Sequence, residues 1–161
     1  MGTTGRDTAR VEFEQMLLGR YMHLRHGKEH RAEGILDRSA YILLSRIRVQ
    51  GPMSIGQLGE AFGLDVSTLN RQTAAAARAG LVERIPDPDG GLARKFRITE
   101  EGARRLDQDR ARVIAGLDRI MADWPEERIA AFADHLQHFN ASLEQLHGLP
   151  WPRQGEPRAG A

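Results

Sequence analysis

Apolar residues recur every three or four positions through most of this chain, the spacing of helices with one buried face. The first repeat spans Thr8 to about Lys28, and its apolar members are Phe13, Leu17, Tyr21 and Leu24. A second repeat begins after Asp37, a residue type that caps helices, and stops at Gly51 and Pro52. The pattern therefore predicts two helices in the first third of the chain.

Two shorter amphipathic helices are predicted next, over Ser54–Phe62 and Val66–Ala79. Ser54 and Gln57 have the spacing of a capping box at the start of the first one. Gly63 supplies the positive φ that the short turn between them needs. Together these features predict a helix–turn–helix.

The second of these helices, which Asp65 can cap, presents an outer face suited to DNA. At about 100° per residue, the residues that face inward are Val66, Leu69, Thr73 and Ala76. The opposite side and its edges carry small, polar and basic residues: Ser67, Thr68, Asn70, Arg71, Ala74, Ala75 and Arg78. Small side chains let the backbone approach a groove, where Asn70 can pair with adenine and Arg71 with guanine or phosphate. The alternative is an ordinary solvated helix face.

Two β-like runs, Leu81–Ile85 and Lys95–Ile98, enclose a segment rich in Pro, Asp and Gly and predict a hairpin. A hairpin after a helix–turn–helix is the winged-helix arrangement, with the second helix in the major groove and the hairpin beside the backbone or minor groove. The predicted fold class is therefore mainly α, a winged helix-turn-helix domain with a small β-hairpin wing. The candidate DNA-binding residues are Ser54, Ser67, Thr68, Asn70, Arg71, Arg78, Arg94 and Lys95.

Two more helices are predicted in the last third of the chain. Thr99 begins the first, and Trp124–Glu127 is a break and restart with proline at the first turn. Beyond it, apolar residues alternate steps of three and four as in a heptad: Ile129, Phe132, Leu136, Phe139, Leu143 and Leu146. This seam is either the core face of a monomer or a dimer interface. We favour a homodimer, because the terminal helices have little else to bury against.

The chain is predicted to form one domain, residues 8–147, between two flexible ends, residues 1–7 and 148–161, the second of which carries Trp151, a side chain suited to docking on the domain. Inside the domain, dimerisation helices at about 8–30 and 104–147 flank the winged helix-turn-helix at about 36–105.

Composition narrows the classes of function. Lys+Arg 23 against Asp+Glu 22 gives a net charge of +1, so DNA binding would depend on local clustering of cations. Cys is absent, which excludes disulfides and thiolate metal sites. There is no run of about 18 apolar residues and no apolar leader, so we expect a cytoplasmic protein with no membrane partner.

Catalytic and metal sites are not predicted. No GxSxG, HExxH or P-loop pattern is visible, so we expect no enzyme activity and no cofactor. Histidines gather on the first helix at His23, His26 and His30 and on the last at His135 and His138. A zinc site there, and with it a metal-dependent enzyme, is the weaker interpretation, because structural zinc usually needs four fixed ligands. Tyr21, Met22 and Tyr41 are candidate ligand-binding residues, with core packing as the alternative for each.

Four short motifs stand out between about Leu36 and Leu106. They are Ser67-Thr68-Leu69-Asn70-Arg71, Gly80-Leu81-Val82-Glu83-Arg84, Asp87-Pro88-Asp89 and Ile98-Thr99-Glu100-Glu101-Gly102. Together they resemble the MarR (multiple antibiotic resistance regulator) family. The resemblance implies a winged-helix homodimer, formed by the first and last helices, that binds palindromic operators, usually as a repressor relieved by a small ligand. It also implies recognition-helix contacts by Ser67, Thr68 and Arg71.

Two positions depart from that family's pattern. The family usually carries Asp-Arg-Arg at the wing tip, where this chain has Gly90-Gly91-Leu92. Leu92 cannot replace the arginine that reaches the minor groove, so Arg94, two residues on, is the expected substitute. Ala74-Ala75 stands where the family tends to carry Asp-Arg, so a phosphate contact is expected to be lost.

These observations predict a sequence-specific DNA-binding transcriptional regulator, a ligand-responsive homodimeric repressor of a palindromic operator. Its expected partners are double-stranded DNA, a second copy of the chain and a small-molecule effector. The alternative is a winged-helix protein-interaction module without DNA binding, which Leu92 and the balanced charge favour.

Overall fold

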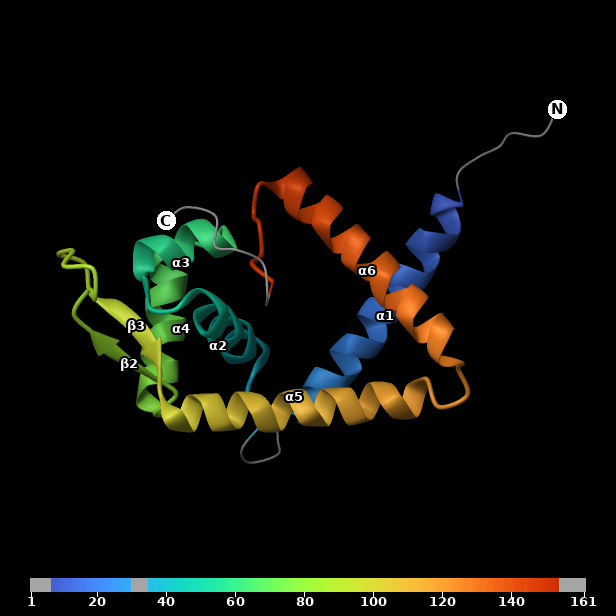
Figure 1. Cartoon of the computed structure of the whole chain (residues 1–161), viewed down its shortest axis with the longest axis horizontal. Helices are drawn as coiled ribbons and strands as arrows, with labels where there is room; N and C mark the ends of the chain where they lie inside the picture. Colours follow the sequence, from blue (N-terminus) through green and yellow to red (C-terminus); the bar gives the residue numbers. More distant parts are fainter. Residues whose placement is uncertain (1–6, 30–34, 154–161) are drawn as a thin grey trace.

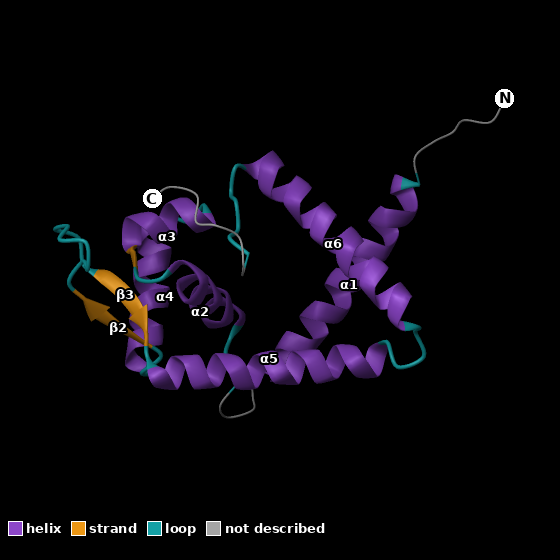
Figure 2. Ribbon diagram, in the orientation of Figure 1, coloured by secondary structure: helices purple, strands orange, loops and turns teal. Residues whose placement is uncertain are grey.

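The computed structural model describes residues 7–29 and 35–153. Within these ranges it describes every side chain except those of residues 23–29. Its helices are α1 (Thr8–Glu29), α2 (Arg38–Gln50), α3 (Ile55–Phe62), α4 (Val66–Arg78), α5 (Glu100–Ile120) and α6 (Glu126–His147). Its strands are β1 (Met53–Ser54), β2 (Val82–Ile85) and β3 (Lys95–Ile98). Helices α2 to α4 and the strands form one lobe, from which α5 runs toward α1 and α6 (Figure 1). The result is the mainly helical winged helix-turn-helix expected from the sequence (Figure 2).

Local side chains set the ends of the helices in this lobe. At the start of α2, Asp37 accepts a hydrogen bond of 2.8 Å from the Ala40 amide. Ser54 and Gln57 form the predicted capping box at the start of α3. The Ser54 amide donates to Gln57 Oε1 at 2.9 Å, and the Gln57 amide donates to Ser54 Oγ at 3.2 Å. An N-cap contributes about 1 kcal/mol, so these helix starts are specified locally.

Residues 63–65 form the turn between α3 and α4. Gly63 adopts the expected positive φ of 63°, and its amide donates to the Gly59 carbonyl at 2.9 Å. Asp65 caps α4 by accepting a hydrogen bond of 2.8 Å from the Thr68 amide. The turn therefore needs a left-handed glycine at one end and a capping carboxylate at the other.

The sheet is antiparallel, with the strand order β1-β3-β2. The hairpin pairs Val82 with Ile98 and Ile85 with Lys95, as the two β-like runs suggest. The sequence pattern does not predict β1, in which Met53 pairs with Phe96. Two residues are too short for an alternating pattern to appear, yet this strand ties the start of α3 to the wing.

The core lies where α2, α3, α4, the sheet and the start of α5 meet. Its buried side chains are Leu43, Leu44, Ile47, Met53, Leu58, Leu69, Ala76, Leu81, Val82, Phe96 and Leu106. Leu69, Thr73 and Ala76 face this core as predicted, but the inward placement of Val66 is wrong, because its side chain is 59% exposed. Val66 is the first residue of α4, and helical side chains lean toward the N-terminus, so this one projects past the edge of the core.

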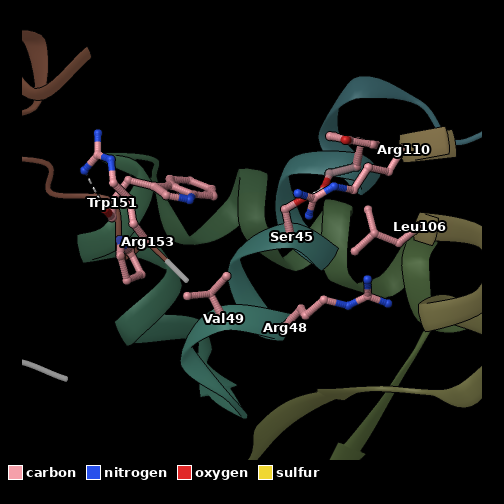
Figure 3. Close-up of a pocket in the computed structure, with 9 residues that line it drawn as sticks. Ser45, Arg48, Val49, Leu106, Arg110, Trp151 and Arg153 are labelled. Carbon is pink, nitrogen blue, oxygen red and sulfur yellow. Dashed lines mark hydrogen bonds between the residues drawn. The ribbon is translucent and has the colours of Figure 1, made fainter. Parts of the chain in front are cut away.

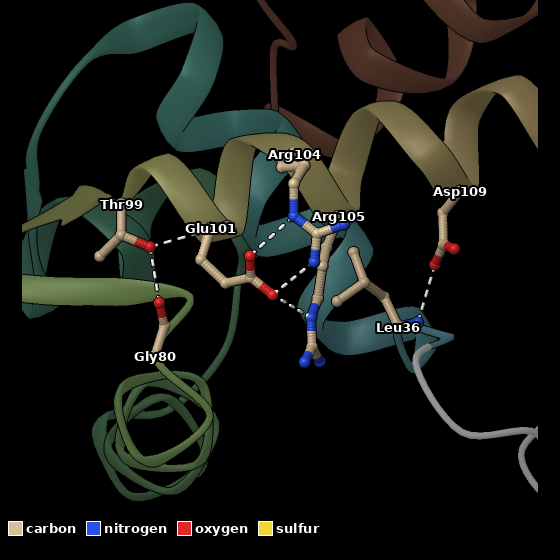
Figure 4. A network of polar contacts seen from close by, with 8 residues as sticks. Leu36, Gly80, Thr99, Glu101, Arg104, Arg105 and Asp109 are labelled. Atoms are coloured by element: carbon tan, nitrogen blue, oxygen red, sulfur yellow. Dashed lines mark hydrogen bonds and ion pairs between the residues drawn. The ribbon is translucent and has the colours of Figure 1, made fainter.

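The corner between α4 and β2 is fastened to α5 (Figure 4). Thr99 accepts a hydrogen bond of 3.0 Å from the Gly102 amide, and its hydroxyl donates to the Gly80 carbonyl at 2.6 Å. A Cβ at Gly102 would lie 2.1 Å from the Leu81 carbonyl oxygen. Glycine at this position therefore allows the backbones of α5 and the corner to touch.

Two carboxylates on α5 organise their neighbours in the same view (Figure 4). Glu101 accepts hydrogen bonds from Arg104 and Arg105, which lower its pKa to about 2. Asp109 is buried and accepts a hydrogen bond of 2.7 Å from the Leu36 amide. The first contact stabilises the opening turns of α5, and the second holds the chain before α2 against it.

The outer helices bury little of their apolar surface. No residue of α6 is buried, and Pro125 is its N-cap rather than a member of its first turn. The outer helices are α1, α6 and the part of α5 beyond the lobe. Their large exposed apolar side chains are Val11, Phe13, Met16, Leu18, Tyr21, Val113, Ile114, Leu117, Ile120, Phe132, Leu136, Phe139, Leu143 and Leu146. None of the described helices is long and apolar enough to cross a membrane.

Candidate nucleic-acid interface

The outer face of α4 is the candidate surface for DNA, because the second helix of a helix–turn–helix is the one that enters the major groove. Ser67, Asn70, Arg71 and Arg78 are exposed there, and Thr68 is half-buried. On the opposite face the Thr73 hydroxyl donates to the Leu69 carbonyl at 2.8 Å, so the one hydroxyl that α4 buries is satisfied. The polar residues of α4 thus divide between core and surface as the angular pattern predicts.

The first turn of α4 is organised around Asp65. Its carboxylate accepts hydrogen bonds from the Ser67 hydroxyl, the Thr68 amide and the Thr68 hydroxyl. These bonds, first of all that from the Ser67 hydroxyl, hold the pKa of Asp65 well below its usual range. Both hydroxyl hydrogens are therefore engaged. Ser67 and Thr68 can accept from base amino groups as they stand, but each must leave Asp65 before it can donate to a phosphate.

The two arginines of α4 are in a different state. Neither Arg71 nor Arg78 makes a hydrogen bond or an ion pair within the described part of the chain, and both are exposed. They lie about 20° apart on the outer face, two turns from each other along the helix. A guanidinium group in this position can reach a base edge or a phosphate without breaking an internal contact.

Lys95, a candidate DNA-binding residue of the wing, is buried rather than free on the surface. It is 8% exposed, and its Nζ lies 2.9 Å from Asp87 Oδ1 and 3.5 Å from Asp89 Oδ2. The hydrogen bond with Asp87 raises the pKa of Lys95 and lowers that of Asp87. Lys95 therefore fixes the base of the wing, and reaching a phosphate would require breaking this ion pair.

The wing tip carries an apolar side chain with no cover. Leu92 is fully exposed, and Gly90 beside it has a φ of +80°. A Cβ at Gly91 would lie 2.3 Å from the Asp87 carboxylate, so the loop closes tightly over that residue. The Arg94 guanidinium donates to the Arg84 carbonyl at 3.3 Å, which keeps this cation on the wing.

Ser54 occupies the junction of β1 and α3. Its hydroxyl oxygen accepts from the Gln57 amide, and it pairs in register with Lys95. A hydroxyl that accepts one hydrogen bond can still donate another. The geometry is thus compatible with a phosphate contact in addition to the capping role.

A pocket of about 260 Å³ lies between α2, α5 and the segment after α6. It is lined by Tyr41, Ser45, Arg48, Val49, Leu106, Arg110, Trp151, Pro152 and Arg153. Figure 3 shows Trp151 and Arg153 on one side of it and Leu106 and Arg110 on the other. Of the candidate ligand-binding residues only Tyr41 is at this pocket, since Tyr21 is 61% exposed on α1 and neither Tyr21 nor Met22 lines it.

Only some of the candidate histidines have side chains in the described part of the chain. The side chains of His23 and His26 and the whole of His30 lie outside the described residues, and His135 and His138 are exposed on α6. Among the residues described, no group of three or more His, Asp or Glu side chains is placed to hold a metal ion.

The cations of the pocket are not predicted by the sequence. Arg48 donates to Asp107 and, at 2.9 Å, to the Ala103 carbonyl, so it joins α2 to α5. Arg110 and Arg153 come from α5 and from the chain's last described residues. No motif connects positions so far apart, so no pattern in the sequence indicates this pocket.

Comparison with known proteins agrees with this geometry. The MarR family model matches residues 36–90. The uncharacterized HTH-type transcriptional regulator YxaD of Bacillus subtilis is 34% identical over 110 residues, which are 68% of this chain and 77% of that protein. A MarR family protein from Bacillus stearothermophilus has a similar structure, with a TM-score of 0.74 and 18% identity over 88% of this chain and 99% of that one. The PcaV transcriptional regulator from Streptomyces coelicolor, solved with its natural ligand, has a TM-score of 0.58 and 22% identity over 80% of this chain and 92% of its own. The chain therefore belongs to the MarR family, whose members are transcriptional regulators that generally bind DNA, and it is not an enzyme.

Proposed function

We propose that this chain binds a palindromic operator as a homodimer and represses transcription until a small ligand releases it. The observation that carries the proposal is the outer face of α4, where Arg71 and Arg78 are exposed and without internal partners among the described residues. The exposed alanines between them, Ala74, Ala75 and Ala77, allow the close approach that major-groove reading requires. Ser67, Thr68 and Asn70 complete the proposed contact surface, with Ser54 and Arg94 at its edges.

The homodimer is supported by the apolar surface of the outer helices. Phe132, Leu136, Phe139 and Leu143 are at least one-third exposed on one side of α6. Side chains of this kind are seldom left in a continuous exposed row unless another surface covers them. A twofold axis through these helices would give each dimer two copies of α4, which suits half-sites about 34 Å apart.

The pocket beside Tyr41 is the proposed effector site. Three guanidinium groups, from Arg48, Arg110 and Arg153, line it. Arg48 and Arg153 already pair with Asp107 and Glu144, so among the described residues Arg110 is the pocket cation without an ion pair. Trp151 and Tyr41 add flat apolar surface, so a small anion with an apolar body fits the chemistry. Screening small carboxylates by thermal shift tests this assignment. A stabilising compound should lose its effect in Arg110→Met and keep it in the control Arg119→Met, on the exposed part of α5.

The direct test of the proposed function is to sequence the DNA that the purified protein retains from a genomic library. The expected result is an enriched palindrome, bound by two chains per site in native mass spectrometry. A retained pool without a common sequence, or a single chain per site, would contradict the proposal.

A protein-interaction module is the second candidate, and the exposed Leu92 favours it. Under this alternative the wing tip contacts an apolar patch on another protein. The same DNA selection distinguishes the two, because the alternative predicts no enriched sequence even at low salt, where phosphate contacts are strongest.

A further inference from the structure

The chain turns back on itself after α6. Gly148 has a φ of +66° and ends the helix, and the residues that follow run back toward α2 and α3 (Figure 1). The composition of residues 148–161 predicts a flexible tail, but the described part, 148–153, makes specific contacts. The Trp151 ring stacks on Phe62 of α3, with centroids 5.9 Å apart and planes at 22°. The Arg46 guanidinium of α2 lies 5.0 Å from the same ring.

Polar contacts fix the segment at both ends. Arg46 is 6% exposed, and its Nη1 donates to the Pro150 carbonyl at 2.9 Å. Glu144, near the end of α6, accepts from the Trp151 amide at 3.1 Å and from Arg153 Nη2 at 2.6 Å. A second bond of 3.1 Å from Arg153 makes the guanidinium–carboxylate pair bidentate, the geometry that holds such pairs most firmly.

The segment also reaches the turn of the helix–turn–helix. A Cβ at Gly63 would lie 3.2 Å from Leu149 Cδ1, so the leucine side chain covers this turn closely. Gly63 separates α3 from α4, the helix proposed to read DNA. Leu149 and Trp151 therefore contact the helix–turn–helix at its turn and at the end of α3.

We propose that Leu149–Arg153 is a strap that fastens α6 to the helix–turn–helix and so sets where α4 lies relative to the outer helices. Since α6 buries none of its own side chains, the strap supplies anchoring that the helix lacks. Its consequence for DNA rests on the proposed function. If α6 lies in the dimer interface, the strap sets the spacing of the two α4 helices and thereby the half-site spacing that is accepted.

The strap can be tested without DNA. The chain has no Cys, so Ala75→Cys on α4 and Ala141→Cys on α6 introduce a unique pair of spin labels. Labelled protein mixed with an excess of unlabelled chain reports the distance within one chain by pulsed electron paramagnetic resonance. We expect one narrow distribution for the full chain and for a control ending after Arg153. In Trp151→Ala and in a chain ending after Gly148, the width of the distance distribution should at least double. Unchanged distributions in both strap variants, with helicity intact, would overturn the proposal.

A DNA measurement then separates the strap from the proposed function. Two copies of the selected half-site are placed at spacings that differ by one base pair. The full chain should prefer one spacing by roughly tenfold, a discrimination of the size that a single mismatched base pair produces. The strap variants should lose most of this preference while still binding. A full preference in the strap variants would overturn the strap's role in spacing. If the full chain bound no DNA at all, the proposed function would fail, and the spin-label distances would still decide whether the strap holds α4 and α6 together.

Discussion

Lys95 Nζ and Asp87 Oδ1 lie 2.9 Å apart beneath the wing, with both side chains about nine-tenths buried. This pair joins the first residue of β3 to the loop that carries the wing tip. A second carboxylate, Asp89, approaches the same ammonium at 3.5 Å. The wing is therefore held by a buried cation rather than by apolar packing alone.

Replacing this cation should loosen the wing. In Lys95→Met, two carboxylates lose their shared partner, and a carboxylate left near the protein interior without its cation is destabilising. We expect a lower melting temperature and faster amide hydrogen exchange in residues 82–98. The matched control is Arg97→Met, at a residue of the same strand as Lys95. It removes the exposed ion pair between Arg97 and Glu83 of β2. Because exposed pairs contribute little, equal losses in the two variants would refute the buried role of Lys95.

Gly102 should tolerate no side chain. In Gly102→Ala the new Cβ would meet the Leu81 carbonyl oxygen at 2.1 Å, so α5 or the α4–β2 corner must move. We expect the free energy of unfolding to fall by about 1–3 kcal/mol, the range for overpacked sites. Gly56→Ala, whose Cβ would have its nearest neighbour at 3.8 Å, is the control and should be neutral or stabilising. Chemical denaturation of the two variants gives the comparison, and equal stability would disprove the close approach.

Leu92 is the position at which this wing lacks the family's cation. In Leu92→Arg the new guanidinium, on a fully exposed tip, can meet phosphates or the minor groove. We expect tighter operator binding and an increase of about 1 in the number of counterions released, read from the slope of log K against log salt. Leu92→Ala should leave that slope unchanged. No gain in Leu92→Arg would show that the tip does not approach DNA.

The strap should release in acid. The hydrogen bond from Arg153 holds the pKa of Glu144 below its ordinary value. A carboxyl group of depressed pKa stabilises the fold fully above about pH 4.3, the ordinary pKa of glutamate. This contribution is lost as the pH falls through the lower pKa of the group in the native state. Strap anchoring should therefore weaken between these two values.

The emission of Trp151 can follow this release. The chain has two Trp residues, so Trp124→Phe leaves Trp151 as the single reporter. Its emission should shift to longer wavelength in acid before helicity is lost. Glu144→Gln should show the shifted emission already at neutral pH and no acid transition of its own. An acid transition that persists in Glu144→Gln would assign it to another group.

The parts of this fold that the sequence predicts well are local ones. The capping box of Ser54 and Gln57 and the left-handed Gly63 depend on residues within a few positions of each other. The contacts that were missed join distant positions. Arg46 and Pro150 are separated by 104 residues, and no periodicity relates them. The buried pairing of Lys95 with Asp87 was missed for the same reason: the charge of Lys95 is visible in the sequence, but the loop that folds Asp87 over it is not.

The DNA face divides in a similar way. Helical angles place Arg71 and Arg78 outside and Leu69 inside, because one helix obeys one period. They fail for Val66, since a side chain at the first turn has no core to face. Hydrogen bonding of the Ser67 and Thr68 hydroxyls to Asp65 depends on rotamers, which a residue pattern does not contain.

The central claim is that α4 reads DNA through Arg71 and Arg78. The most direct measurement is fluorescence anisotropy of the selected operator with the double variant Arg71→Ala/Arg78→Ala, with Arg119→Ala as the control of equal charge type on α5. Two lost contacts of about 1–3 kcal/mol each predict an affinity at least tenfold lower, with a shallower salt dependence, while the control binds like the unchanged chain. Equal affinity in the double variant and the control would contradict the assignment of α4 as the DNA-reading helix.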